Sequence, residues 1–160
     1  MEFNAGKTYL MMERVPLRTH QILRKELTRG RKVLYFSKHS PDILRSQFDF
    51  NPNMIEMRWL NPRPNMDCSS PMNLEAFEEK ATSFMLNNED GIVVVNGVEV
   101  LEMWNGFRPV LERLRSMQKK VSANGNNLII TFDPKSQITD HVKDLNGIAD
   151  EVIADRSIQT

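Results

Sequence analysis

The chain of 160 residues has the length of one ordinary domain, and its 40% hydrophobic and 26% charged residues are typical of a globular protein. Its 21 basic and 21 acidic residues cancel, which excludes the strongly basic field of a general nucleic-acid-binding protein. One cysteine, Cys68, excludes an internal disulfide, and three dispersed histidines, His20, His39 and His141, lack the spacing of metal ligands.

The chain offers no segment suited to a membrane. No apolar run approaches the roughly 20 residues that cross a bilayer, and the first twenty residues lack the apolar block of a signal peptide. We therefore expect a cytoplasmic protein without direct membrane insertion. Charge is unevenly spread, since residues 1–64 hold 12 basic and 6 acidic residues and residues 65–160 hold 9 and 15.

Short apolar runs alternate with helical stripes along the first half of the chain. The pattern predicts, in order, a strand at 9–12, a helix with Pro16 in its first turn that runs to about Arg29 and ends at Gly30, a strand at 33–36, a short helix from Ser40 through Phe48, a strand over 54–60 with one wet face near a sheet edge, and a loop over 61–70.

The second half continues the alternation. It predicts a helix over 74–85, a strand over 91–97, a long amphipathic helix over 107–121, a strand at 128–132, a short helix around 140–145 and a strand at 151–153. The strand over 91–97 is apolar on both faces, so we expect it at the centre of the sheet. Gly106 predicts a kink before Phe107.

Repeated strand–helix alternation predicts an α/β fold, a three-layer α/β/α sandwich with a mostly parallel central sheet. We find no internal repeat or linker and interpret residues 1–160 as a single domain. The order of the strands does not follow from the sequence.

Ligands of open α/β sheets collect at the carboxyl ends of the strands. Arg14, Arg18 and Lys38 are expected there and form a hypothetical anion site, with Asn96 as a further ligand-binding residue. The alternative is that these are the polar residues that loops ordinarily contain. Trp104, beside the expected kink, is a candidate contact with a partner or else a packed core side chain.

Gly6-Lys7-Thr8 imitates the end of a phosphate-binding loop. Such a loop needs a strand before it and a helix after it, because helix N-terminal N–H groups hold the phosphates. Only five residues precede Gly6 and a strand follows, so we interpret the match as accidental. The segment that links the first strand to the first helix, residues 13–16, has no glycine and no lysine.

Nucleotide hydrolases of this architecture place an Asp that helps to hold magnesium at the end of an apolar strand. Here Val93-Val94-Val95 ends in Asn96, which is neutral and binds magnesium poorly. We expect neither a metal nor a cofactor, and Glu99 is predicted to begin the next helix.

Several segments together resemble the archaeal domain of unknown function 835, over roughly residues 5–153. They are Gly6-Lys7-Thr8-Tyr9-Leu10, the helix end from Ile22 to Gly30, Trp59-Leu60, Ser70-Pro71 with Leu74, the stretch from Val93 to Leu101, Asn105-Gly106-Phe107, and Ile129 to Pro134. Asn96 stands where the family more often has Asp. The resemblance implies a degenerate RecA/KaiC-type nucleotide-binding fold, found alone or attached to membrane and sensory modules, and no established reaction.

The leading hypothesis is a non-enzymatic interaction or signalling module that keeps a nucleotide-binding scaffold with a degenerate phosphate loop. Its expected partner is another protein or a second copy of the chain. The alternative is a nucleotide or phosphometabolite binder without hydrolysis, whose ligand would be a small anion or nucleotide. An enzyme that acts through carboxylates near Asp133 and Asp140 is a third hypothesis. No nucleic-acid partner is expected, because the basic first helix lacks interleaved aromatic residues.

Overall fold

One sheet holds all the strands of the part of the chain that the structure, a computed structural model, describes, which is residues 1–47 and 51–154. Its seven strands pair in parallel throughout, in the order β4-β3-β2-β5-β6-β1-β7. They are β1 (Thr8–Met12), β2 (Val33–Ser37), β3 (Ile55–Leu60), β4 (Cys68–Ser69), β5 (Ile92–Asn96), β6 (Asn127–Phe132) and β7 (Glu151–Ala154).

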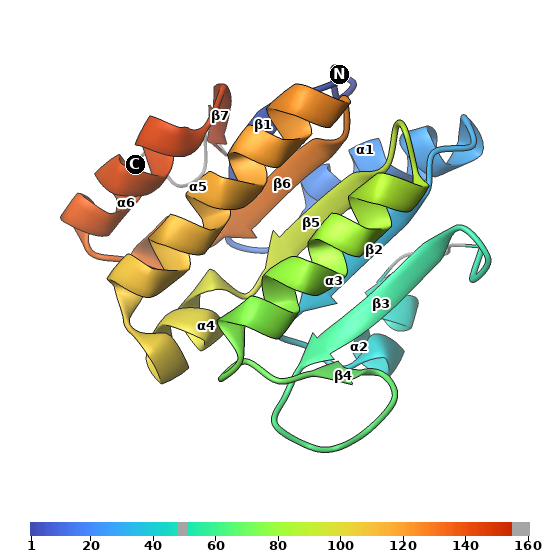
Figure 1. The fold of residues 1–160 in the computed structure, drawn as a ribbon. Coiled ribbons are helices and arrows are strands. Elements are labelled where there is room, and N and C mark those ends of the chain that lie inside the picture. Colours follow the sequence, from blue (N-terminus) through green and yellow to red (C-terminus); the bar gives the residue numbers. More distant parts are fainter. Residues whose placement is uncertain (48–50, 155–160) are drawn as a thin grey trace.

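Helices cover both faces of this sheet and make a three-layer sandwich (Figure 1). They are α1 (Leu17–Thr28), α2 (Pro41–Gln47), α3 (Leu74–Asn87), α4 (Val98–Asn105), α5 (Phe107–Asn124) and α6 (Thr139–Ile148), with a 3-10 turn at Pro134–Ser136. Helices α1 and α2 lie behind the sheet in Figure 1, and the other four lie in front of it. Among the described residues, no helix combines the length and the apolar character that crossing a membrane requires.

Each face of the sheet has its own buried core, because alternate strand residues point to opposite faces. Leu34 and Val93 pack with the apolar stripes of α3, α5 and α6. Tyr35 and Val94, one position further on, pack on the other face with Leu23 of α1. Strand β5 is buried along its whole length at the centre of the sheet, which confirms the prediction from its apolar run.

The all-parallel sheet with helices on both faces confirms the predicted three-layer α/β/α sandwich. The structure corrects three other expectations. The expected loop at 61–70 contains the two-residue strand β4, and the last helix, α6, is longer than the predicted 140–145. Pro16 occupies the cap position of α1 instead of its first turn. The expected end of α2 at Phe48 lies outside the described residues.

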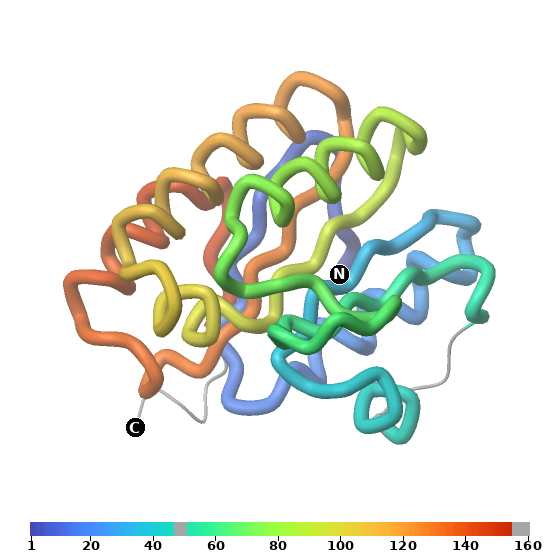
Figure 2. The backbone as a smooth tube through the Cα atoms, turned by 60° about the horizontal axis from the view of Figure 1, so that its bottom comes forward, coloured from blue at the N-terminus to red at the C-terminus, as the bar shows by residue number. Residues whose placement is uncertain are grey.

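Because all strands are parallel, their carboxyl ends share one side of the sheet, here named the carboxyl edge, and their amino ends share the opposite side, the amino edge. Figure 2 brings the carboxyl edge forward, with the blue β1–α1 turn, the cyan α2, the yellow α4 and the orange segment before α6. Helix α5 begins after the kink at Gly106, whose φ of 81° suits glycine, and returns along the sheet.

Candidate functional site

A small hollow lies at the carboxyl edge where β1, β2, β5 and β6 end. Its volume is about 130 Å³. Its polar lining consists of Glu13, Arg14, Lys38, His39, Asn96, Thr131 and Asp133. Three of the four residues predicted to bind a ligand, Arg14, Lys38 and Asn96, therefore meet in this carboxyl-edge hollow. The fourth, Arg18, lies outside its lining, on the exposed side of the first turn of α1.

The N-terminus of α1 is already occupied by a carboxylate of the protein itself. Glu13 follows β1 directly and is buried. Its Oε1 accepts a hydrogen bond from the backbone N–H of Arg18 at 2.7 Å, and its Oε2 accepts bonds from the N–H and the hydroxyl of Thr19 at 3.3 and 2.5 Å. A helix N-terminus attracts anions because its first N–H groups lack partners within the helix. Glu13 supplies that anion internally.

The Gly6-Lys7-Thr8 segment lies at the opposite edge of the sheet, before β1. Gly6 N donates to Asn126 O at 3.0 Å, and Lys7 Nζ lies 3.7 Å from a carboxylate oxygen of Glu151. Thr8 is the first residue of β1, where its N–H donates to Asp150 Oδ2. The prediction that this segment precedes a strand rather than a helix is confirmed.

Lys38 pairs with a carboxylate that sequence reasoning assigned only to a helix start. Its Nζ lies 2.7 Å from Glu99 Oε1 in the first turn of α4, and its backbone N–H donates to Asn96 O at 2.7 Å. The positive charge of Lys38 is therefore largely balanced before any ligand arrives. Burial and the neighbouring Lys38 lower the pKa of His39, against an opposing contribution from Glu99, so His39 adds little positive charge at neutral pH.

The amide of Asn96 is engaged beneath the hollow. Its Nδ2 donates to the Tyr35 hydroxyl at 3.2 Å, and the same hydroxyl lies 2.7 Å from His20 Nε2. All three side chains are buried. Burial lowers the pKa of His20 to about 4 and raises that of Tyr35, so both are neutral at ordinary pH. The Tyr35 hydroxyl thus gives the buried His20 a hydrogen-bond partner.

The hollow is close to electrically neutral. Arg14 and Lys38 bring two positive charges to its lining, and the carboxylates of Glu13 and Asp133 bring two negative ones. Asp133 is itself engaged, since its Oδ1 accepts from Lys135 N at 2.9 Å. Among the described residues, no group of three His, Cys, Asp or Glu side chains is placed to hold a metal ion.

Exposed apolar side chains surround the same edge. Trp104 is 49% exposed at the end of α4, and Met103 beside it is 78% exposed. Others stand on the segments that follow strand ends, namely Val15, Leu17, Ile43, Met66, Met72 and Ile138. Asn105 ties α4 to the segment before α3 through a bond to Pro71 O at 2.7 Å. The edge thus offers apolar contact area as well as polar groups.

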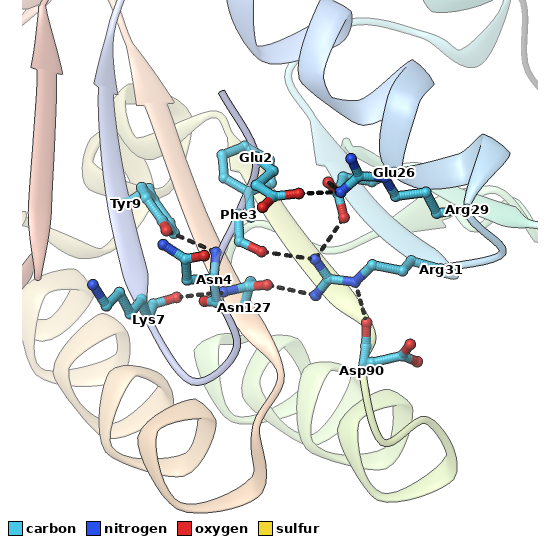
Figure 3. A network of polar contacts seen from close by, with 10 residues as sticks. All are labelled: Glu2, Phe3, Asn4, Lys7, Tyr9, Glu26, Arg29, Arg31, Asp90 and Asn127. Atoms are coloured by element: carbon cyan, nitrogen blue, oxygen red, sulfur yellow. Dashed lines mark hydrogen bonds and ion pairs between the residues drawn. The ribbon is translucent and has the colours of Figure 1, made fainter.

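The amino edge is closed by hydrogen bonds (Figure 3). Arg31 lies at its centre and donates to Phe3 O, Asp90 O, Asn127 Oδ1 and Glu26 Oε2. Asn127 in turn donates to the carbonyls of Asn4 and Lys7, and Arg29 pairs with Glu2. This network fixes the first residues of the chain across the strand starts.

Two features of the site escaped sequence reasoning. A carboxylate shortly before a helix is a general capping signal, so the sequence could have identified Glu13 as a candidate cap. Its hydrogen bonds to Arg18 and Thr19 depend on the geometry of the turn, which the sequence does not give. The Lys38–Glu99 pair joins segments 61 residues apart and requires β2 and β5 to be neighbours.

Comparisons with known proteins place this geometry in context. The family model described as "Protein of unknown function (DUF835)" matches residues 15–145. No curated protein matches the sequence.

Among solved structures, a KaiC-like protein from Pyrococcus horikoshii OT3 is similar, with a TM-score of 0.70, 16% identity, and coverage of 95% of this chain and 73% of that one. The flagellar accessory protein FlaH from Methanocaldococcus jannaschii has a TM-score of 0.66 and 12% identity over 95% of this chain and 72% of that one. At such identities the likeness establishes a KaiC-like fold alone.

Proposed function

The chain belongs to the DUF835 family of proteins of unknown function, and we propose that its KaiC-like scaffold serves as a non-enzymatic interaction or signalling module. The observation that carries this proposal is the occupation of the α1 N-terminus by Glu13. Nucleotide-binding folds of this type hold phosphate on the N–H groups of the helix that follows the first strand. Here two of those groups, on Arg18 and Thr19, bind Glu13.

Displacing Glu13 would be costly. Hydrogen bonds to a charged group contribute about 1.5–3 kcal/mol each, and an incoming phosphate would have to replace three of them. The displaced carboxylate would then be a buried negative charge beside the phosphate, and like charges at short range repel. The segment that makes this turn, residues 13–16, contains no glycine that would let the backbone curl around the phosphates.

Size and charge support the same proposal. The hollow of about 130 Å³ falls below the roughly 300–1,000 Å³ of ordinary small-molecule pockets. Its lining is close to neutral, whereas phosphate sites concentrate positive charge. The neutral Asn96, already bonded to Tyr35, stands at the strand end where a magnesium-binding carboxylate would be needed.

A role in contacts with other proteins is supported by the apolar side chains of the carboxyl edge. Exposed Trp and Met side chains are enriched at protein interfaces, where they supply large contact areas. Trp104 and Met103 are the obvious anchors. A free thiol at Cys68 fits the reducing cytoplasm in which we place this activity.

A thermal-shift screen with magnesium and a panel of adenine and guanine nucleotides, combined with a turnover assay, tests the proposal. A ligand at about 100 times its dissociation constant stabilises a protein by roughly 2.7 kcal/mol, which is a shift of about 5–11 °C for a chain of this size. We expect no shift and no turnover above background. Turnover that Lys38→Ala abolishes would overturn the proposal.

The second candidate function is binding of a small phosphometabolite or nucleotide without hydrolysis. Its specific support is that Arg14 and Lys38 line one hollow together with other residues of the β1–α1 turn. It predicts a thermal shift without turnover, reduced by Arg14→Ala. The control is Arg63→Ala, which removes an exposed cation from a loop outside the hollow.

A further inference from the structure

The solvent face of α1 carries a stripe of positive charge. At 3.6 residues per turn, six exposed residues fall within about 120° of the helix circumference. They are Leu17, Arg18, Gln21, Arg24, Lys25 and Thr28, here named the α1 stripe. The opposite side of the helix carries Thr19, Ile22 and Leu23, which are buried. The stripe is therefore the surface that α1 presents outward.

The cations of the α1 stripe lack ion-pair partners within the described part of the chain. The one carboxylate of the helix, Glu26, is buried and pairs with Arg31 and Arg29 instead. Arg14, in the turn before the helix, is exposed and likewise unpaired among described residues. A cation in the first turn of a helix opposes the helix dipole. The fold gains nothing from Arg18 at that place.

Helix α5 shows how the same protein treats cations elsewhere. Arg113 and Lys120 pair with Glu78 of α3, and Arg115 pairs with Glu112. Three of the five cations of α5 are thus balanced by carboxylates, and Arg108 and Lys119 have no ion pair among the described residues. In α1, none of Arg18, Arg24 and Lys25 has one. Unbalanced positive charge is therefore denser on α1, with three unpaired cations in 12 residues, than on α5, with two in 18 residues.

Apolar exposure at one end of the stripe narrows the class of partner. Leu17 is 63% exposed and Val15 is 49% exposed, and both lie beside Arg14 and Arg18. A phosphate backbone offers nothing to aliphatic side chains, and no aromatic residue stands on α1 to stack on a base. A protein segment that alternates carboxylates with leucine-like side chains matches both the charges and the apolar end.

From this match we infer that the α1 stripe, with Arg14 and Val15, docks an acidic segment of another protein that also contains aliphatic side chains. The inference rests on the proposed interaction function and names the chemistry of its partner. The carboxylates of that segment would face Arg14, Arg18, Arg24 and Lys25, and its aliphatic side chains would cover Leu17.

Fluorescence anisotropy with the full chain tests this. The probes are a fluorescein-labelled peptide rich in Glu and Leu and a second peptide in which Ser replaces each Leu. We expect saturable binding of the Glu/Leu peptide that weakens with added salt. Arg18→Glu/Lys25→Glu should weaken it at least about tenfold, and Leu17→Ser should weaken the Glu/Leu peptide but leave the Glu/Ser peptide unchanged.

The matched control is Arg108→Glu/Lys119→Glu, which reverses two exposed α5 cations and changes net charge equally. It should alter binding less than about twofold, and circular dichroism should show both double variants folded. Equal loss in both double variants, or no peptide binding, would overturn the inference.

Binding of single-stranded DNA or of phosphatidylserine vesicles that depends on the α1 stripe and is tighter than binding of the Glu/Leu peptide would also overturn it. So would a dimer in light scattering that Arg18→Glu/Lys25→Glu abolishes. None of these failures bears on the nucleotide screen, so loss of this inference and loss of the proposed function are distinguishable.

Discussion

The amino edge and the carboxyl edge of the sheet both carry arginines, but the arginines are bonded within the chain at one edge and exposed at the other. At the amino edge, Arg31 and Asn127 bind carbonyls and one carboxylate from three other segments and hold the start of the chain in place (Figure 3). At the carboxyl edge, Arg14 and Arg18 stand unpaired among described residues, and apolar side chains such as Trp104 remain exposed. One edge is closed by contacts within the chain, and the other leaves cations and apolar side chains exposed.

The comparison also separates two places in the chain where a phosphate-binding segment would be sought. The Gly-Lys-Thr sequence lies at the closed amino edge, where Gly6 and Lys7 serve the fold. In the strand-to-helix turn at the open edge, the N–H groups at the start of α1 bind Glu13. Function at the open edge is therefore expected from its surface rather than from a phosphate grip.

The largest effect is expected at the amino edge. Arg31→Met removes four hydrogen bonds and leaves the buried Glu26 with Arg29 alone, at 3.4 Å. Breaking one partner of a buried pair costs about 3–5 kcal/mol, and the remaining Arg29 reduces this to about 3. Urea unfolding measures the loss. Arg45→Met, which breaks only the exposed pair with Asp42, should cost less than about 0.5 kcal/mol.

A loss below about 1 kcal/mol for Arg31→Met would show that the amino edge is not held by this network. The amino edge could then no longer be described as the edge that contacts within the chain hold closed.

At the carboxyl edge, Glu13→Ala should lower the free energy of unfolding by about 2 kcal/mol, because Arg18 N–H and the buried Thr19 lose their acceptor. Glu13→Gln, which keeps one acceptor, should cost about half as much. The control is Asp133→Ala, which caps only a 3-10 turn and should cost under about 1 kcal/mol. A Glu13→Ala variant with an unchanged free energy of unfolding would show that the cap is dispensable.

The buried His20 should make stability depend on pH. Its pKa is lowered from 6.5 to about 4 in the folded chain. At pH values between about 4 and 6.5, the unfolded chain therefore binds the His20 proton more readily than the folded chain does. Stability is then fully present above about pH 6.5 and falls as pH drops toward 4, by about 2 kcal/mol between pH 7 and pH 5.

His20→Gln should flatten that part of the profile, since glutamine does not titrate. His39→Gln, at a less buried site whose pKa is lowered to a smaller extent, should leave most of the slope in place. An unchanged slope in His20→Gln would assign the pH dependence to other groups.

Among the residues of the carboxyl edge, only a small effect on stability is expected from Trp104→Ala. The side chain is half exposed at the end of α4, so its removal should cost less than about 1 kcal/mol. If the carboxyl edge binds a partner through this residue, the same variant should weaken that binding by about 2 kcal/mol or more. A large stability loss would instead identify Trp104 as a packing residue.

The periodicity of apolar residues predicted most of the fold. The signal is local and clear in four elements: the continuous apolar runs of β2, β5 and β6 and the apolar stripe of α5. In each of them, the apolar residues are the ones that the structure buries. Strand β4 gave no such signal, because two residues cannot show a period. Its pairing with β3 rests on backbone bonds across the loop, in which Trp59 N–H donates to Asp67 O and Asn61 N–H donates to Ser69 O.

The site was predicted only in part, for a geometric reason. Placing Arg14 and Lys38 at one edge needed only the direction of the strands. That Lys38 is paired with Glu99, or that Asn96 turns its amide to Tyr35, depends on which strands are neighbours. Strand order is set by contacts between distant segments and leaves no trace in local patterns.

The central claim is that Glu13 keeps the N-terminus of α1 closed to phosphate. Nuclear magnetic resonance tests this claim directly, because it monitors the backbone amides that bind Glu13. In an ¹⁵N-labelled sample titrated with magnesium–ATP, the backbone amide signals of Arg18 and Thr19 should stay where they are. Saturable movement of both signals, absent when magnesium–ATP is replaced by magnesium chloride at equal ionic strength, would contradict the claim.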